Sequence, residues 1–168
     1  VFCYMVKNNF GWEVRVIDGV AEAGLIFDGV KQVVPIGTER VLILDIGGGS
    51  NEFVIANKEG VLWKQSFELG MARLLDKFHP SDPIAPAEIK AVEGYVRSEL
   101  APLYEAIRQY PINMLIGSSR SFDTLAAMIA AQHHPHLDIT QTSSYFIPIP
   151  SFEELHRKLI ASSADQRM

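Results

Sequence analysis

The stretch that most constrains the fold of this chain is VLILDIGGGSNEFVIA, residues 41–56. Two apolar runs, 41–44 and 53–56, stand on either side of a glycine-rich segment. Short apolar runs bounded by turn-forming residues are typical of buried β-strands. The pattern therefore predicts a strand, a glycine loop and a second strand, arranged as a hairpin on a rigid sheet.

The loop of this hairpin has the composition of an anion-binding site. The three glycines at 47–49 permit positive φ values and a close approach of a ligand to the main chain. Together with Ser50 they can present backbone amides to an anion. Asp45 ends the first strand and Glu52 opens the second, so pairing of the strands would place both carboxylates at the mouth of the loop. Two carboxylates beside a phosphate suit Mg²⁺.

A glycine-rich turn with two incidental acids is the simpler interpretation, although three consecutive glycines exceed what a turn needs. Two other phosphate-binding motifs are excluded. No Gly-Lys-Ser/Thr follows the glycines, as a Walker loop requires, and a strand rather than a helix follows them, unlike a dinucleotide-binding fingerprint.

The composition predicts a sizeable core and no nucleic-acid surface. Hydrophobic residues make up 48% of the 168 residues, and the formal net charge is −5 without a basic run. This balance argues against DNA as a partner. Cys3 is the single cysteine, so we expect a reducing, cytoplasmic compartment. No apolar stretch reaches the roughly 18 residues of a membrane span. The chain opens on Val1 without a signal-peptide pattern, and we interpret it as a piece of a longer protein.

Hydrophobic periodicity predicts the remaining elements. Strands are expected at 12–17, 61–69, 113–116 and 145–149, and helices at 20–33, 71–78, 87–110, 121–132 and 152–162. Asp18 is expected to cap the first of these helices, and Pro102 to kink the long one. A three-stranded antiparallel meander followed by strand–helix units is the plan of a ribonuclease H-like α/β domain. We therefore expect a mixed five-stranded sheet flanked by helices.

Three further groups of residues are candidates for chemistry. Glu22 lies in the first turn of the helix that precedes the hairpin, where the helix dipole alone would favour an acid. The loop 117–121, Gly-Ser-Ser-Arg-Ser, precedes a helix, so it could bind an anion or simply cap that helix. The histidines between 133 and 136 match no zinc spacing and are more typical of a helix C-terminus.

Four segments together resemble the exopolyphosphatase/guanosine pentaphosphatase (Ppx/GppA) family in their order and spacing. They are IDGVAEAGLIFDGV (17–30), LILDIGGGSNEFVI (42–55), ELGMARL (68–74) and IGSSRSFDTLA (116–126). The family belongs to the superfamily of acetate and sugar kinases, heat-shock ATPases and actin. The resemblance covers roughly residues 10–165, and aspartate followed by Ile, three glycines, Ser and then Glu is specific to the family.

The resemblance implies a role for each motif. Glu22 stands where the family has its catalytic base, and Asp45 and Glu52 match its acidic pair, which holds Mg²⁺ or the nucleophilic water. The first phosphate loop corresponds to Gly47, Gly48, Gly49 and Ser50, and the second to Gly117, Ser118 and Ser119. The implied reaction is release of the terminal phosphate from inorganic polyphosphate or from guanosine pentaphosphate.

The chain also departs from the family pattern. Asp18 replaces a usual Ser, Asn51 a usual Thr, and Arg120 a usual Gly in the second loop. We expect Arg120 either to reshape that loop, because Arg adopts positive φ less readily than Gly, or to contact phosphate directly.

The family places its site between two domains, and nothing here corresponds to the first phosphate-binding domain. We therefore interpret residues 1–34 as the linking strand and helix of a first domain, and 35–168 as the second domain, inactive alone and a homodimer in the full protein. A sensor that binds polyphosphate without hydrolysis and an ATP-using member of the superfamily are the alternatives.

Overall fold

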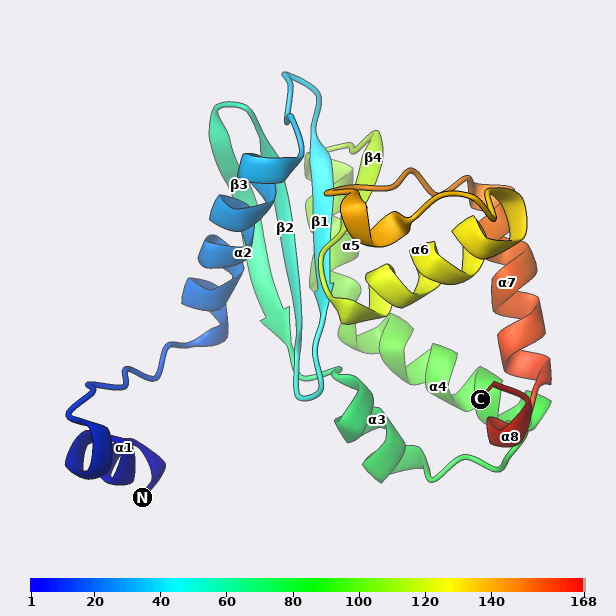
Figure 1. Cartoon of the computed structure of the whole chain (residues 1–168), viewed down its shortest axis with the longest axis horizontal. Coiled ribbons are helices and arrows are strands. Elements are labelled where there is room, and N and C mark those ends of the chain that lie inside the picture. Colours follow the sequence, from blue (N-terminus) through cyan, green and yellow to red (C-terminus); the bar gives the residue numbers. More distant parts are fainter. Residues whose placement is uncertain (168) are drawn as a thin grey trace.

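The centre of the molecule is a four-stranded mixed sheet, seen in a computed structural model that describes residues 1–167 (Figure 1). Its strands are β1 (Val41–Ile46), β2 (Asn51–Asn57), β3 (Gly60–Phe67) and β4 (Met114–Gly117). They lie in the order β3-β2-β1-β4. The first three form the predicted antiparallel meander, and β4 runs parallel to β1. The predicted hairpin is confirmed.

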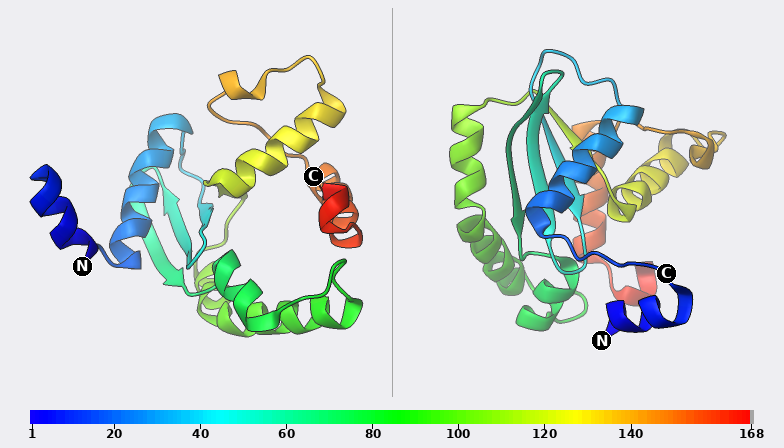
Figure 2. Two further views of the ribbon diagram at one scale, coloured as in Figure 1. Left: turned by 60° about the horizontal axis from the view of Figure 1, so that its bottom comes forward. Right: turned by 90° about the vertical axis from the view of Figure 1, so that its left-hand side faces the viewer.

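Side chains alternate between the two faces of this sheet. On one face Val41, Ile43, Val54 and Ala56 pack against helix α2 (Gly19–Val33), through residues such as Ala23. The other face packs against α4 (Pro86–Glu99) and α5 (Ala101–Gln109), and its buried residues are Leu42, Phe53, Ile55, Phe67, Leu69, Leu103 and Ala106. Figure 2 shows the sheet between these two helical layers.

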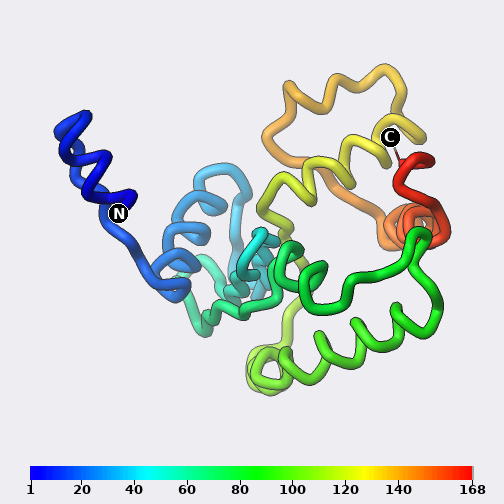
Figure 3. The backbone as a smooth tube through the Cα atoms, turned by 90° about the horizontal axis from the view of Figure 1, so that it is seen from below, coloured from blue at the N-terminus to red at the C-terminus, as the bar shows by residue number. Residues whose placement is uncertain are grey.

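The remaining helices lie around the sheet. They are α1 (Phe2–Phe10), α3 (Met71–Phe78), α6 (Arg120–His133), the short 3₁₀ helix η1 (Ile139–Gln141), α7 (Ile149–Ala161) and α8 (Ala164–Arg167). The first of these, α1, extends away from the sheet and buries none of its residues (Figure 3). Among the described helices, none has the length and apolar character needed to cross a bilayer.

Two predicted strands are wrong. Residues 12–17 form no strand, and Trp12 and Val16 are 71% and 85% exposed. Their alternating pattern is that of a strand, but a strand also needs a partner, and none of the described strands pairs with this segment. Residues 145–148 are extended but unpaired, and α7 begins at Ile149 with a proline in its first turn. The described sheet therefore has four strands rather than five.

The long helix predicted for residues 87–110 is divided at Leu100 into α4 and α5. Pro102 occupies the first turn of α5, where its missing amide costs no intrahelical hydrogen bond. The predicted effect of Pro102 is thus confirmed as a break between two helices.

The packing of Ile43 gives a test of this core. Ile43 is fully buried between β1 and α2, so Ile43→Ala should lower the free energy of unfolding by about 2–5 kcal/mol, through lost burial and the cavity left behind. Denaturant unfolding measures the change. The matched control is Val16→Ala, because Val16 is exposed and should change stability by less than about 0.5 kcal/mol. Equal effects of the two changes would contradict the assignment of the core.

Candidate active site

Three polar residues meet at the end of the sheet beside the glycine loop. Asp45 on β1 and Glu52 on β2 are direct cross-strand partners, and Glu52 is in turn the partner of Ser66 on β3. By strand alternation all three lie on the α2 face, with Ile43 and Val54 behind them. The Ser66 hydroxyl donates a hydrogen bond of 2.7 Å to Glu52 Oε1. The predicted pair of carboxylates is therefore present, and Glu52 is only 2% exposed.

Helix α2 brings a third carboxylate to this site. Asp18 caps the helix as predicted, accepting a 2.7 Å hydrogen bond from the Ala21 amide. Gly19 lies against β3 so closely that a Cβ atom there would be 2.4 Å from Ser66 Cβ. The first turn is thereby fixed beside Glu52. Glu22, one turn further on, is exposed and close enough to act electrostatically on Asp45.

The electrostatics of the site centre on Asp45. Burial raises the pKa of the Asp45 carboxyl above its ordinary value of 3.8, and the neighbouring Glu52 carboxylate raises this pKa further. The Ser118 hydroxyl, which approaches Asp45, lowers the pKa, while Glu22 adds a smaller upward effect. Asp45 and Glu52 thus place two like charges next to each other, and a proton or a bound cation would relieve their repulsion.

The first turn of α3 binds the glycine loop through backbone hydrogen bonds. The amides of Gly70, Met71 and Ala72 donate to the loop carbonyls of Gly49, Gly47 and Gly48, at 3.3, 3.0 and 2.9 Å. Each carbonyl of the three glycines is therefore occupied. The amides of Gly48 and Gly49 donate no hydrogen bond within the described residues, so they are available to an anion.

The three loop glycines were expected to be needed for positive φ values, and the structure gives a different reason for them. None of the three loop glycines has a positive φ. A Cβ at Gly47 would be 2.7 Å from the Ser50 carbonyl oxygen, whereas no atom lies within 4 Å of a Cβ at Gly48 or Gly49. Gly47 is thus required by the turn itself, while Gly48 and Gly49 leave open space for a close approach to the backbone.

The second loop joins the end of β1. The Ser118 amide donates to the Leu44 carbonyl (2.8 Å), and the Ile46 amide approaches the Ser119 hydroxyl oxygen (3.4 Å). Gly117 contacts the Phe122 ring where no Cβ would fit. Arg120 is the first residue of α6 and has no positive φ, so the strain expected for Arg in this loop is absent. A contact between Arg120 and phosphate stays a prediction.

Residues away from the acids were also candidates. His134 packs edge-on against Tyr145. Across residues 1–167 no group of three or more His, Cys, Asp or Glu side chains is close enough to hold a metal ion. The histidines therefore form no such cluster, and the acidic site could offer one or two carboxylates to an ion.

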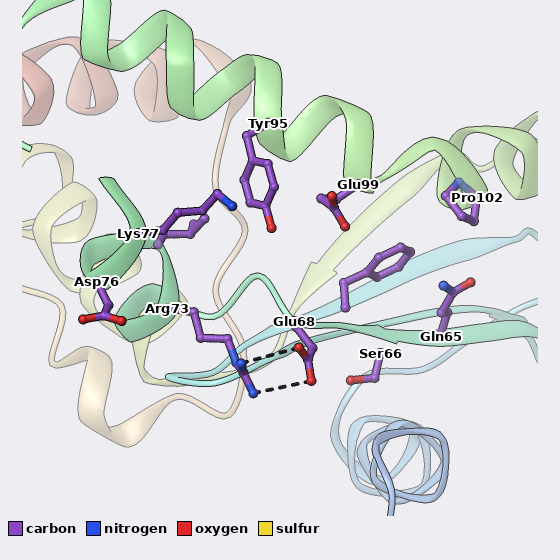
Figure 4. Close-up of a pocket in the computed structure, with 11 residues that line it drawn as sticks. Gln65, Ser66, Glu68, Arg73, Asp76, Lys77, Tyr95, Glu99 and Pro102 are labelled. Carbon is purple, nitrogen blue, oxygen red and sulfur yellow. Dashed lines mark hydrogen bonds and ion pairs between the residues drawn. The ribbon is translucent and has the colours of Figure 1, made fainter. Parts of the chain in front are cut away.

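A cavity of about 620 Å³ lies on the opposite face, between β3, α3 and α4 (Figure 4). Arg73 pairs there with Glu68, with guanidinium and carboxylate 3.4 Å apart, and the Lys77 ammonium lies 4.2 Å from the centre of the Tyr95 ring. Both cations already have partners within the protein. None of Glu22, Asp45 and Glu52 lines this cavity. The candidate site is therefore the end of the sheet where Asp45 and Glu52 lie beside the glycine loop, and not the cavity.

Sequence reasoning missed Gly19, Ser66 and Gly70. A serine within a strand and a glycine before a helix are common, and each matters here only through a contact with a residue distant in the sequence. A Cβ at Gly70 would lie 2.4 Å from the backbone of Gly48 and Gly49, which no sequence pattern reveals.

The contact at Gly70 can be tested by Gly70→Ala. The added methyl group has to displace the glycine loop, which should cost about 1–3 kcal/mol of stability and weaken the binding of phosphate anions to the loop. Denaturant unfolding and calorimetric phosphate titration measure these effects. Gly94→Ala is the matched control: Gly94 lies inside α4 with open space around it, so that change should stabilise by about 0.5–1 kcal/mol. A Gly70→Ala protein as stable as the control would contradict the close contact.

The raised pKa of Asp45 predicts a pH dependence of stability. The native state holds this proton more tightly than the unfolded chain, so stability falls as pH rises from 3.8 through the raised pKa. Asp45→Asn removes the ionisable group, so the variant should not show this fall in stability as pH rises. Thermal unfolding without divalent cations should show a stabilising effect that is larger at about pH 7 than at about pH 3. The exposed Asp76→Asn is the control. A pH-independent difference for Asp45→Asn would contradict the electrostatic description.

Comparison with known proteins agrees with this geometry. The model of the Ppx/GppA phosphatase family matches residues 1–168. The crystal structure of an exopolyphosphatase from Cytophaga hutchinsonii superposes with a TM-score of 0.94 at 42% identity, over 98% of this chain and 53% of that one. An Aquifex aeolicus Ppx/GppA family member shares the fold at 22% identity, with a TM-score of 0.81 over 99% of this chain and 52% of that one.

A provisionally named exopolyphosphatase of Haemophilus influenzae is 28% identical over 139 residues, which are 83% of this chain and 43% of the relative. The chain thus spans about half the length of the relatives it matches. The family model covers the whole chain. In the structure, the glycine loop, the acidic pair and α2 also have the expected arrangement. The chain therefore belongs to the Ppx/GppA phosphatase family.

Proposed function

We propose that this chain is part of a phosphohydrolase that releases terminal phosphate from inorganic polyphosphate or guanosine pentaphosphate. The observation that carries the proposal is a pair of facing carboxylates beside a loop whose amides are free, with Glu22 in the first turn of the helix that packs on the same face. Asp45 and Glu52 face each other across the hairpin, Glu22 acts on Asp45, and the Gly48 and Gly49 amides have no internal acceptor. The 42% identity with an exopolyphosphatase supports polyphosphate as the substrate class.

The chemistry follows from what such a site supplies. Phosphoryl transfer depends mainly on positioning and on neutralising charge. The amides of Gly48 and Gly49 would bind oxygens of the terminal phosphate, and Ser118 and Ser119 would contact it from the second loop. Glu22 is exposed, so its carboxylate can accept a proton from an attacking water molecule.

Mg²⁺ fits the donor set of the site. Asp45 and Glu52 would hold it, because adjacent carboxylates with a raised Asp45 pKa are relieved by a hard cation. When bound, Mg²⁺ would neutralise charge on the phosphoryl oxygens. The glycine loop and the two carboxylates come from one rigid hairpin, so this chain's residues fix the distance between the phosphate and the acidic pair.

The domain organisation is part of the proposal. We assign residues 1–34 to a link with a first domain and residues 35–168 to a second, ribonuclease H-like domain, whose three-stranded meander and parallel β4 match that plan. The part of the relatives' length that this chain does not cover would complete the site. We further propose that the full protein is a cytoplasmic homodimer and that this chain alone has little activity.

A sensor that binds polyphosphate without hydrolysis is the second candidate. The observation that favours it is Arg120, which begins α6 directly after Ser118 and Ser119 and is exposed. Its guanidinium is available to bind phosphate tightly in two hydrogen bonds. The retained Glu22, Asp45 and Glu52 favour the enzyme over this alternative.

Phosphate release from long-chain polyphosphate, measured with Mg²⁺ on the full-length parent protein, tests the proposal. Glu22→Gln should reduce the rate by about 10²–10⁴-fold, because the variant loses its general base. Glu59→Gln is the matched control, since Glu59 is exposed in the turn between β2 and β3 at the opposite end of the hairpin. A parent that binds polyphosphate without releasing phosphate would overturn the enzyme and support the sensor.

A further inference from the structure

The Glu52 carboxylate has an unusual environment for a charged group. Among the described residues, Glu52 is the one charged side chain in the buried core, at 2% exposure. The Ser66 hydroxyl is the hydrogen-bond donor found for it, at 2.7 Å from Oε1. A buried carboxylate is strongly destabilising when it lacks hydrogen-bond donors. The one hydrogen bond from Ser66 therefore stabilises the carboxylate more than a hydrogen bond at the surface would.

Ser66 itself is fixed on two sides. It is the cross-strand partner of Glu52 in the pairing of β2 with β3. From the other side Gly19 presses against it, leaving 2.4 Å between Ser66 Oγ and a Cβ atom built at position 19. Figure 4 shows Ser66 on the side of β3 that faces α2, whereas Tyr95 and Glu99 approach from the opposite side. The Ser66 hydroxyl thus lies between Gly19 and Glu52, and it donates to Glu52.

We propose that Ser66 is a positioning residue for the phosphohydrolase site, which holds Glu52 Oε1 so that Oε2 alone faces the substrate side beside Asp45. The inference rests on the proposed function, because it assigns Glu52 to the site. Ser66 touches no reacting atom and acts through Glu52. Gly19 belongs to the same arrangement, since it provides the space in which the hydroxyl points at the carboxylate.

The size of the effect expected for Ser66→Ala can be estimated from other sites in which one residue orients a catalytic or metal-binding side chain. Removing a group that orients a ligating or catalytic side chain typically lowers metal affinity or activity by about 10–100-fold. Misplacement of a reacting group by about 1 Å reduces rate more than binding. A fall in kcat with little change in KM is therefore expected for Ser66→Ala.

The experiment compares three variants of the full-length parent by steady-state phosphate release from polyphosphate with Mg²⁺. Ser66→Ala should lower kcat by about 10–100-fold, with KM within about twofold of the parent. Ser66→Thr keeps the hydroxyl and should restore most of kcat. Ser98→Ala is the matched control, since it removes an exposed hydroxyl bonded to the Tyr95 carbonyl, and it should behave as the parent does.

Two kinetic results would overturn the inference: a Ser66→Ala protein that matches Ser98→Ala, or Ser66→Ala and Ser66→Thr proteins that lose kcat equally. If Ser66→Ala does not fold, Ser66→Cys takes its place, because a thiol fills similar space and donates weakly; an unchanged kcat in that protein would also count against Ser66.

Crystal structures of the parent and of the substituted protein separate this inference from the proposed function. A parent that releases no phosphate disproves the function but leaves the orientation of Glu52 measurable. A Glu52 carboxylate that rotates away in the Ser66→Ala or Ser66→Cys structure supports the positioning role. An unmoved carboxylate overturns it, whatever the activity.

Discussion

The pairing of Asp45 with Glu52 across β1 and β2 is the interaction on which the site depends. Like charges directly opposite each other destabilise an antiparallel pair, and burial of one of them adds to the cost. The hairpin forms nevertheless, because the strands behind these acids are among the most buried parts of the molecule; Ile43, Val54 and Ile55 are fully buried. An apolar hairpin therefore holds two carboxylates in an arrangement that they would not adopt alone.

The neighbouring elements hold this end of the sheet from both sides. On one face α2 is fixed by the Asp18 cap and by the contact of Gly19 with Ser66. On the other side the first turn of α3 donates to the carbonyls of the glycine loop, which directs the free amides of Gly48 and Gly49 outward. The free amides at a helix N-terminus can themselves bind an anion. Here the first-turn amides of α3 bond the loop carbonyls instead, so the amides left without an internal acceptor are those of Gly48 and Gly49 in the loop.

The sequence predicted those parts that depend on neighbours in the chain. The hairpin, the cap at Asp18 and the facing carboxylates follow from alternation and from turn residues within 20 positions, and all are found. The segment 12–17 has the right alternation but no partner strand, and periodicity cannot report a missing partner. Ser66 and Gly70 were missed for the related reason that their importance comes from contacts with Gly19 and Gly48. Arg120 was judged by an assumed loop conformation, whereas the helix already begins there.

The environments of the carboxylates distinguish their roles within the proposed mechanism. Glu22 is exposed on the first turn of a helix, where water reaches it directly. Glu52 is buried and bound by a hydroxyl, so it can hold charge in a fixed position but has little access to a water molecule. Asp45 is the cross-strand partner of Glu52, and the neighbouring acids raise its pKa. Acids whose surroundings differ in this way commonly have different roles in a site, which supports our proposal that Glu22 accepts a proton and that the hairpin pair binds a cation.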